Sequence, residues 1–286
     1  LTAALLAAVL ALSIALPVLA SDDGDTIYIN SVSDLLSLAR NCAYDQWSVG
    51  KTVILQKDLS LEGMLWEPIP SFSGQFKGNG HTISDLTITG QYSPAGLFGI
   101  VEEQGSIESL SVRGVVSVSD SADTTTGGIV GINHGTLISC QFTGVVTGDS
   151  EVGGIVGRNE SEGTIDHGTA RAIVTGKSST GGIAGYNLGA ITGCTNVGSI
   201  NTEYPEASLD TDGFTAKMVD YINNKMAAAD NDATNSVTNV ATDTGGIAGR
   251  SSGMILTSVN TGTIGYEHVG YNVGGIVGRT DGLVSG

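Results

Sequence analysis

The sequence predicts an all-β protein: a right-handed parallel β-helix with an N-terminal helical cap and one helical insertion. The first observation is a pentamer, Gly-Gly-Ile-(Val/Ala)-Gly, which starts at positions 127, 153, 181, 245 and 274. The differences between these starts are 26, 28, 64 and 29 residues, and a period in this range is typical of stacked repeats. The second is that most of the 42 glycines recur periodically, which favours a repeat architecture over disorder.

Each repeat divides into three short strands separated by glycines, such as Gly-Ile-Val, Thr-Leu-Ile and Gly-Val-Val in the first repeat. Three strands in this length make one turn of a parallel β-helix, and successive coils then lie about 4.8 Å apart. The pentamer isoleucine should form a buried ladder, in which each side chain contributes about 1.5–3 kcal/mol. Its members are Ile129, Ile155, Ile183, Ile247 and Ile276.

Residues 1–20 are expected to be a signal peptide, because they are nearly all apolar and end in small residues before Ser21. The basic region that normally precedes such a segment is missing and the chain does not begin with Met, so we expect a truncated start. A retained anchor helix is the alternative to cleavage.

Residues 21–52 are expected to form an N-terminal cap. A short strand is predicted from Thr26 to Ile29, followed by a helix with Ser31 or Ser33 as its N-cap. The apolar face of this helix is predicted to comprise Val32, Leu35, Leu36 and Ala39. Such a helix would cover the strand edges and interior that an open solenoid end exposes.

Residues 53–286 are expected to be β-helix coils, with clean repeats from Ala95 onward. The 64-residue step indicates an insertion at 203–244, within which Thr215 to Ala229 has the apolar spacing of a helix packed on the solenoid flank. The sequence stops after half of a strand at Gly286, so we expect the natural protein to continue beyond this mid-coil position.

A second pattern recurs after the pentamers: x-Asn-x-Gly-x-Ile, then a small residue, then Gly-x-Val. The first and third repeats carry it at Asn133, Gly135, Leu137, Cys140, Gly144 and Val146, and at Asn187, Gly189, Ile191, Cys194, Gly198 and Ile200. This pattern resembles the GLUG-motif repeats of bacterial secreted and cell-surface proteins. The resemblance implies right-handed β-solenoid coils, in adhesin-like proteins or beside a catalytic domain.

Charge narrows the classes of partner. A net charge of −17 disfavours nucleic acid, whose phosphates need Lys and Arg, and it disfavours an anionic membrane surface. It suits a protein that is secreted or displayed at the cell surface. After cleavage of the signal segment, no stretch is long and apolar enough to span a membrane.

Two motifs resemble catalytic signatures but lack the required context. Gly249 to Gly253 fits Gly-x-Ser-x-Gly, yet Ser251 occupies the slot of Asn133, Asn159 and Asn187 and precedes another strand rather than a helix. The slot favours a short polar side chain that bonds the backbone of a corner. Gly-Lys-Ser at 176–178 lacks the first glycine of a phosphate loop. We therefore assign no catalytic residue.

The three cysteines are Cys42, Cys140 and Cys194. Cys140 and Cys194 share one column of the repeats but lie two coils apart, or about 9.6 Å, which exceeds the roughly 7 Å limit for the Cα atoms of a disulfide. We predict that both are buried free thiols.

Carboxylates at equivalent loops of successive coils keep an enzymatic alternative open. Asp120, Asp123, Asp149 and Glu151 could perform acid–base chemistry on an acidic polysaccharide or hold Ca²⁺, which is the one cofactor considered. The other signatures of pectin-cleaving hydrolases, Gly-His-Gly and Arg-Ile-Lys, are absent from the sequence. Solvated corner charges are the simpler interpretation, and we predict no metal site.

The position after each pentamer is the candidate binding site. If the insertion loops out, Arg158, Tyr186, Arg250 and Arg279 stack along one corner after Ile132. This basic and aromatic stripe could bind an acidic glycan or a protein through cation–π and bidentate contacts. Alternatively, the same side chains only cover apolar surface.

These observations predict a non-catalytic, exported repeat module of a bacterial surface or adhesin-like protein, which supplies a rigid rod or binding surface. Its expected partners are cell-wall or host glycans or surface proteins. Two alternatives stay open: a carbohydrate-active β-helix, acting as a polysaccharide lyase or glycoside hydrolase, and an accessory stalk of a peptidase-type surface enzyme.

Overall fold

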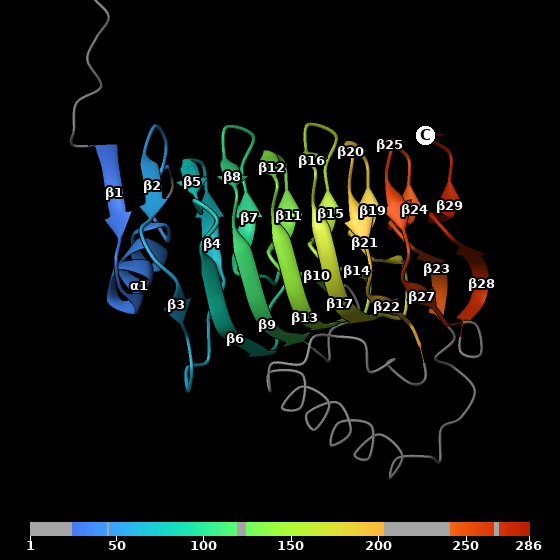
Figure 1. Ribbon diagram of the computed structural model, residues 1–286, viewed down its shortest axis with the longest axis horizontal. Helices are drawn as coiled ribbons and strands as arrows, with labels where there is room; N and C mark the ends of the chain where they lie inside the picture. Colours follow the sequence, from blue (N-terminus) through green and yellow to red (C-terminus); the bar gives the residue numbers. More distant parts are fainter. Residues whose placement is uncertain (1–24, 45, 119–123, 203–240, 266–268) are drawn as a thin grey trace, which may run out of the picture.

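The computed structural model describes residues 25–44, 46–118, 124–202, 241–265 and 269–286. These residues form a parallel β-helix of about seven turns, whose coils follow one another along the long axis, with one helix, α1 (Val32–Asn41), at the N-terminal end (Figure 1). The predicted all-β solenoid with a helical cap is thereby confirmed. The expected signal peptide (1–20), insertion helix (215–229) and the acidic residues Asp120 and Asp123 lie outside the described residues.

The strands form four parallel sheets. Sheet A contains, in spatial order, β1 (Thr26–Ile29), β2 (Thr52–Leu55), β5 (Gln75–Lys77), β8 (Ser106–Glu108), β12 (Thr136–Ile138), β16 (Thr164–Asp166), β20 (Ala190–Thr192), β25 (Met254–Leu256) and β30 (Leu283–Ser285). Sheet B contains β3 (Leu59–Ser60), β6 (Thr82–Gly90), β9 (Ser111–Val118), β13 (Gln141–Thr147), β17 (Thr169–Thr175), β21 (Thr195–Asn196) and β26 (Val259–Asn260), with β22 (Ser199–Ile200) and β27 (Thr263–Ile264) beside this path.

The other two sheets flank the pentamers. Sheet C contains β4 (Ile69–Phe72), β7 (Phe98–Val101), β11 (Val130–Asn133), β15 (Val156–Asn159), β19 (Ala184–Asn187), β24 (Ala248–Ser251) and β29 (Val277–Thr280). Sheet D contains β10 (Thr125–Gly127), β14 (Glu151–Gly153), β18 (Thr180–Gly181), β23 (Ala241–Gly245) and β28 (Val269–Gly274).

Sheet D corrects the prediction of three strands per coil, because a coil such as β10 to β13 has four. Its strands precede the pentamers and are two to six residues long, as in β18 and β28. Each ends in the first pentamer glycine, so too few side chains remain to show the alternation that marks a strand in a sequence.

The register of sheet C shows how the stack passes the 64-residue step. Val130 pairs with Val156, Val156 with Ala184, and Ala184 with Ala248. Strand β24 therefore pairs with β19 as β19 pairs with β15, and the coil that begins at β23 continues the stack in register. Strand β23 begins at Ala241, so the last four residues of the expected insertion at 203–244 belong to the coil.

The interior is apolar and changes in bulk along the axis. Four members of the predicted isoleucine ladder, Ile129, Ile155, Ile183 and Ile247, are fully inaccessible. The fifth, Ile276 in the last coil, is only partly buried. Near the N-terminal end the rings of Phe72, Phe76 and Phe98 pack with centroids 5.3–6.3 Å apart. Isoleucine and alanine fill the later coils, so apolar burial stabilises the whole length of the stack.

A buried polar ladder runs beside this core. The Nδ2 of Asn133 donates to Oδ1 of Asn159 at 2.8 Å, Asn159 repeats this bond to Asn187 at 2.8 Å, and Asn187 donates to Oγ of Ser251 at 3.1 Å. All four side chains are fully buried. The slot expected to favour short polar residues therefore links the coils as well as bonding its own corner, since Asn133 also bonds Gly135.

Helix α1 lies across the N-terminal end of the stack (Figure 1). Ser31 is its N-cap and accepts a hydrogen bond from the amide of Asp34 at 3.2 Å. Leu35 and Leu38 are buried, whereas Val32, Leu36 and Ala39 pack against the core in part. Leu38 extends the apolar face predicted from the sequence.

All three cysteines are buried and free, as predicted for Cys140 and Cys194. The amide of Gly168 donates to Sγ of Cys194 at 3.2 Å, which places this glycine between the two thiols in their column. Burial raises the pKa of each of these two thiols to about 12 and that of Cys42 to about 11. The three groups are therefore inert small hydrophobes at neutral pH.

Candidate binding ladder on sheet C

The structure places the four predicted site residues in one row. Arg158 pairs in register with Tyr186, Tyr186 with Arg250, and Arg250 with Arg279, on strands β15, β19, β24 and β29. We call this row the Arg/Tyr ladder. Because each following residue of the first three strands points inward into the polar ladder, the Arg/Tyr ladder faces outward, since alternate side chains of a strand point to opposite faces.

The Tyr186 ring is held between two guanidinium groups. The Cζ atom of Arg158 lies 5.1 Å from the ring centroid, and that of Arg250 lies 5.0 Å from it. Both distances fall within the roughly 6 Å range of cation–π attraction. Since the arginines come from the coils before and after Tyr186, they cover its two faces. The Tyr186 hydroxyl also lies 3.3 Å from Oγ of Ser252.

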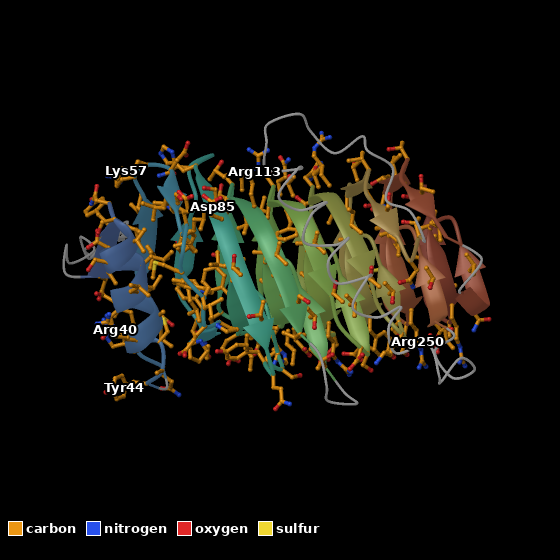
Figure 2. The ribbon with its side chains drawn as sticks, turned by 90° about the horizontal axis from the view of Figure 1, so that it is seen from below. Arg40, Tyr44, Lys57, Asp85, Arg113 and Arg250 are labelled. Atoms are coloured by element: carbon orange, nitrogen blue, oxygen red, sulfur yellow. The ribbon has the colours of Figure 1, made fainter. Side chains whose placement is uncertain are left out.

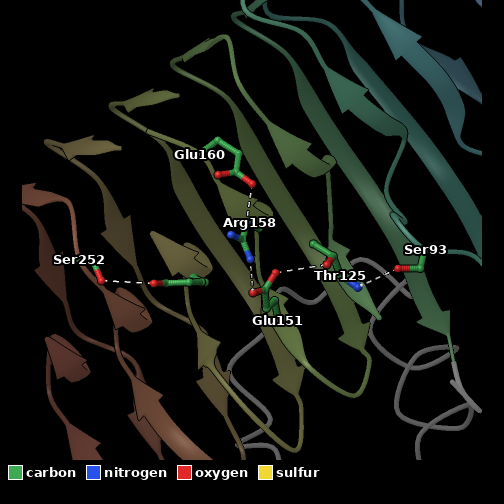
Figure 3. Close-up of polar contacts among 7 residues, drawn as sticks. Ser93, Thr125, Glu151, Arg158, Glu160 and Ser252 are labelled. Atoms are coloured by element: carbon green, nitrogen blue, oxygen red, sulfur yellow. Dashed lines mark hydrogen bonds and ion pairs between the residues drawn. The ribbon is translucent and has the colours of Figure 1, made fainter. Parts of the chain in front are cut away.

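Arg158 is engaged in two ion pairs, which the sequence did not indicate (Figure 3). Its Nη1 lies 2.8 Å from Oε1 of Glu151, and its Nε lies 2.6 Å from Oε1 of Glu160. The Glu151 side chain is only 17% exposed and also accepts a hydrogen bond from Oγ1 of Thr125 at 3.2 Å. One guanidinium facing two carboxylates carries no excess positive charge, so this end of the ladder is not basic.

The ion pairs and burial shift the pKa values of Glu151 and Arg158. Burial raises the pKa of Glu151, and the attraction of Arg158 only partly offsets that effect. Burial alone would lower the pKa of Arg158, but the adjacent carboxylates of Glu151 and Glu160 raise it further than burial lowers it. Arg158 therefore stays charged and fixed.

The positive end of the ladder consists of Arg250 and Arg279. Neither guanidinium forms an ion pair with another residue in the described ranges, although both lie close enough to Asp281 to lower its pKa. The hydrogen bond from Ser252 lowers the pKa of Asp281 more than either arginine does. Figure 2 shows Arg250 toward the end of the molecule opposite to α1, with its side chain on the outer surface.

The carboxylates considered for catalysis are not gathered into a site. Asp149 forms an ion pair with Nζ of Lys177 at 2.6 Å, and Glu151 is paired with Arg158. Within the described part of the chain, no group of three or more His, Cys, Asp or Glu side chains could hold a metal ion. Ser251, the serine of the Gly-x-Ser-x-Gly match, is fully buried in β24 and accepts its hydrogen bond from Asn187.

The structure also shows a hollow that sequence reasoning missed. A cavity of about 650 Å³ lies between α1 and the segment at 65–70. Its lining includes the largely exposed side chains of Tyr44 and Leu65, together with Arg40. Figure 2 shows Arg40 and Tyr44 at the α1 end of the molecule. No repeat pattern covers this segment, because the cap occurs once in the chain.

Comparison with known proteins gives relatives for parts of the chain. No family model matches it, so the GLUG resemblance stays a prediction. It is 30% identical over 155 residues to halomucin of Haloquadratum walsbyi, an alignment that covers 50% of this chain and 2% of that protein. It is 29% identical over 137 residues to a "Putative Gly-rich membrane protein" of Evansella cellulosilytica, with 35% of this chain and 16% of that protein covered. The chain thus spans a small part of the length of these curated relatives.

A solved structure shares the fold. The crystal structure of a "putative immunoglobulin A1 protease" from Bacteroides ovatus superposes with a TM-score of 0.58 at 17% identity, and the match covers 92% of this chain and 76% of that one. Among the described residues, no helix has the length and apolar character needed to cross a membrane.

Proposed function

We propose that this chain is a non-catalytic repeat module of an exported, surface-associated protein, and that its Arg/Tyr ladder is a binding surface. The observation that carries the proposal is the ladder itself: four long side chains from four coils are held in one outward row by strand register. A surface built on regular strands keeps its geometry better than one built on loops.

The names of the two sequence relatives support the surface-associated setting, since one is a mucin by name and the other a membrane protein. Their full activities and partners are not carried over, because the matched segments are small parts of both. The fold shared with the Bacteroides protein supports a second candidate, an accessory stalk beside a peptidase domain. A polysaccharide-cleaving role has less support, because Asp149 and Glu151 are both paired with cations.

The test is a glycan-array and polysaccharide-degradation screen on the full chain, with and without Ca²⁺. We expect binding without release of sugar, and we expect the triple variant Arg158→Ala/Arg250→Ala/Arg279→Ala to lose it. The matched control is Arg40→Ala/Lys77→Ala/Arg171→Ala, which removes the same charge from exposed positions outside the ladder. Release of sugar would overturn the non-catalytic assignment. Equal binding by the two triple variants would show that the Arg/Tyr ladder is not the binding surface.

A further inference from the structure

We infer that the ladder binds a hydroxyl-rich polysaccharide with well-separated carboxylate groups. Arg250 and Arg279 together hold one carboxylate of this ligand, while Arg158 and Tyr186 position Arg250. The inference rests on the proposed binding function and names the chemistry of its ligand.

Both faces of the Tyr186 ring are covered. A sugar that stacks on tyrosine needs an open ring face, but the guanidinium groups of Arg158 and Arg250 lie 5.1 and 5.0 Å from the Tyr186 centroid, one on each side. Tyr186 is therefore not a stacking platform. Its role is to orient Arg250, and Arg158 supports the ring from the other side because Glu151 and Glu160 hold its guanidinium in place.

The positive charge that an anionic ligand can reach is confined to one part of the ladder. Arg158 is neutralised, so the accessible positive charge of the ladder lies on Arg250 and Arg279, which pair in register on adjacent coils. Strands in adjacent coils lie about 4.8 Å apart. Two arginines on strands at this spacing can each donate to one oxygen of the same carboxylate, and charge-assisted bonds of this kind are stronger than neutral ones.

The groups around the arginine pair favour a polyanion with sparse charges over one with dense charges. The arginine pair has the carboxylate of Asp281 and the hydroxyl of Ser252 close by, and Glu160 lies further along the row. These groups accept hydrogen bonds from sugar hydroxyls, but they repel closely spaced sulfates or glutamates, and the chain as a whole carries a net charge of −17. The surroundings therefore favour a uronate-containing glycan over a heavily sulfated glycan or an acidic peptide.

The experiment measures binding of the full chain to four probes: hyaluronan fragments, the same fragments with their carboxylates reduced to alcohols, heparin, and poly-glutamate. Hyaluronan is expected to bind best, and carboxyl reduction is expected to abolish its binding. Arg250→Ala and Arg279→Ala should each weaken binding by about tenfold to a hundredfold, the range for losing a hydrogen bond to a charged group. Arg171→Ala, on the outer face of sheet B, should bind as the unmodified chain does.

The positioning role of Tyr186 is tested by rescue. Tyr186→Phe keeps the ring between the two guanidinium groups and should bind within about twofold of the unmodified chain, whereas Tyr186→Leu removes the cation–π contacts and should weaken binding about three- to fivefold. Thermal unfolding of each variant controls for loss of the fold.

The outcomes separate this inference from the proposed function. If hyaluronan binds but Arg250→Ala and Arg279→Ala bind equally well, the carboxylate site is wrong while a binding module remains. If heparin or poly-glutamate binds more tightly than hyaluronan, the sparse-carboxylate inference is overturned. If none of the probes binds, the inference fails, and the glycan array then decides the proposed function by itself.

Discussion

Replacing Asn159 with alanine should be among the most destabilising single changes available in the middle of this solenoid. The side chain is fully buried and lies between two other asparagines. Its Nδ2 donates to Gly163 O at 3.0 Å and to Asn187 Oδ1 at 2.8 Å, and its Oδ1 accepts from Asn133 Nδ2 at 2.8 Å. Alanine removes these three bonds at once and puts nothing polar in their place.

The expected loss follows from these bonds. Each contributes about 0.5–1.5 kcal/mol net, and a buried polar group left without a partner costs about 1–3 kcal/mol. Asn133 Nδ2 keeps its bond to Gly135 O at 3.2 Å, so the main orphan is Oδ1 of Asn187. The free energy of unfolding should therefore fall by about 2–5 kcal/mol.

The assay is urea denaturation followed by circular dichroism, with midpoint and slope reported together because repeat proteins need not unfold in one step. Asn30→Ala, at an exposed position outside the coils, is the matched control and should change stability by less than about 0.5 kcal/mol. The double variant Asn159→Ala/Asn187→Ala should cost less than the sum of the single changes, because the two residues share a bond. A loss below about 0.5 kcal/mol for Asn159→Ala would refute a stabilising role for the polar ladder.

Three further outcomes are expected. Burial raises the pKa of Glu151 above its ordinary 4.5, so the stability that this group contributes is present below that pH and is lost as pH rises through the pKa of the folded state. The stability of Glu151→Gln relative to the unmodified chain should therefore increase between pH about 4 and about 7. An equal difference in melting temperature at both pH values would contradict this. Cys140 and Cys194, whose pKa values are raised to about 12, should resist thiol reagents in the native state at pH about 8 and react only in denaturant. If the mass of the intact chain showed a disulfide between them, the coil register would be wrong. Gly144→Ala should destabilise the protein by about 2 kcal/mol or more, because its Cβ would overlap the backbone of the preceding coil, whereas Gly99→Ala, whose Cβ would lie 3.1 Å from its nearest neighbouring atom, should cost less.

The longitudinal order of this fold could be predicted because each coil repeats the same column of side chains. Tyr186 and Arg250 are 64 residues apart in the sequence, yet the pentamer before each one identified them as neighbours, and the structure pairs them. The same reasoning placed Cys140 and Cys194 in one column and Ser251 in the asparagine slot. Repetition supplied information that hydrophobic periodicity alone would not contain.

Contacts around the circumference of a coil were harder to predict. Glu151 lies in β14, a strand of three residues that the sequence presents as a loop, and Glu160 follows the corner after β15. Glu151 reaches Arg158 because a fourth strand turns the chain before the pentamer, whereas Glu160 lies two residues beyond Arg158 in the same coil. The charge of the ladder was therefore overestimated at Arg158, since the number of turns in a coil was underestimated.

Parallel pairing of successive coils also determines how this molecule would respond to tension. The hydrogen bonds between strands run along the axis, so a pull between the two ends loads the coils in series and should detach them one at a time. Val130 pairs with Val156, 26 residues further on, and a released stretch of that length can extend to about 90 Å, where the folded coil occupied about 4.8 Å. Each coil can therefore unfold into a long extended segment, and a tether made of such coils would lengthen stepwise under load before any covalent bond was strained.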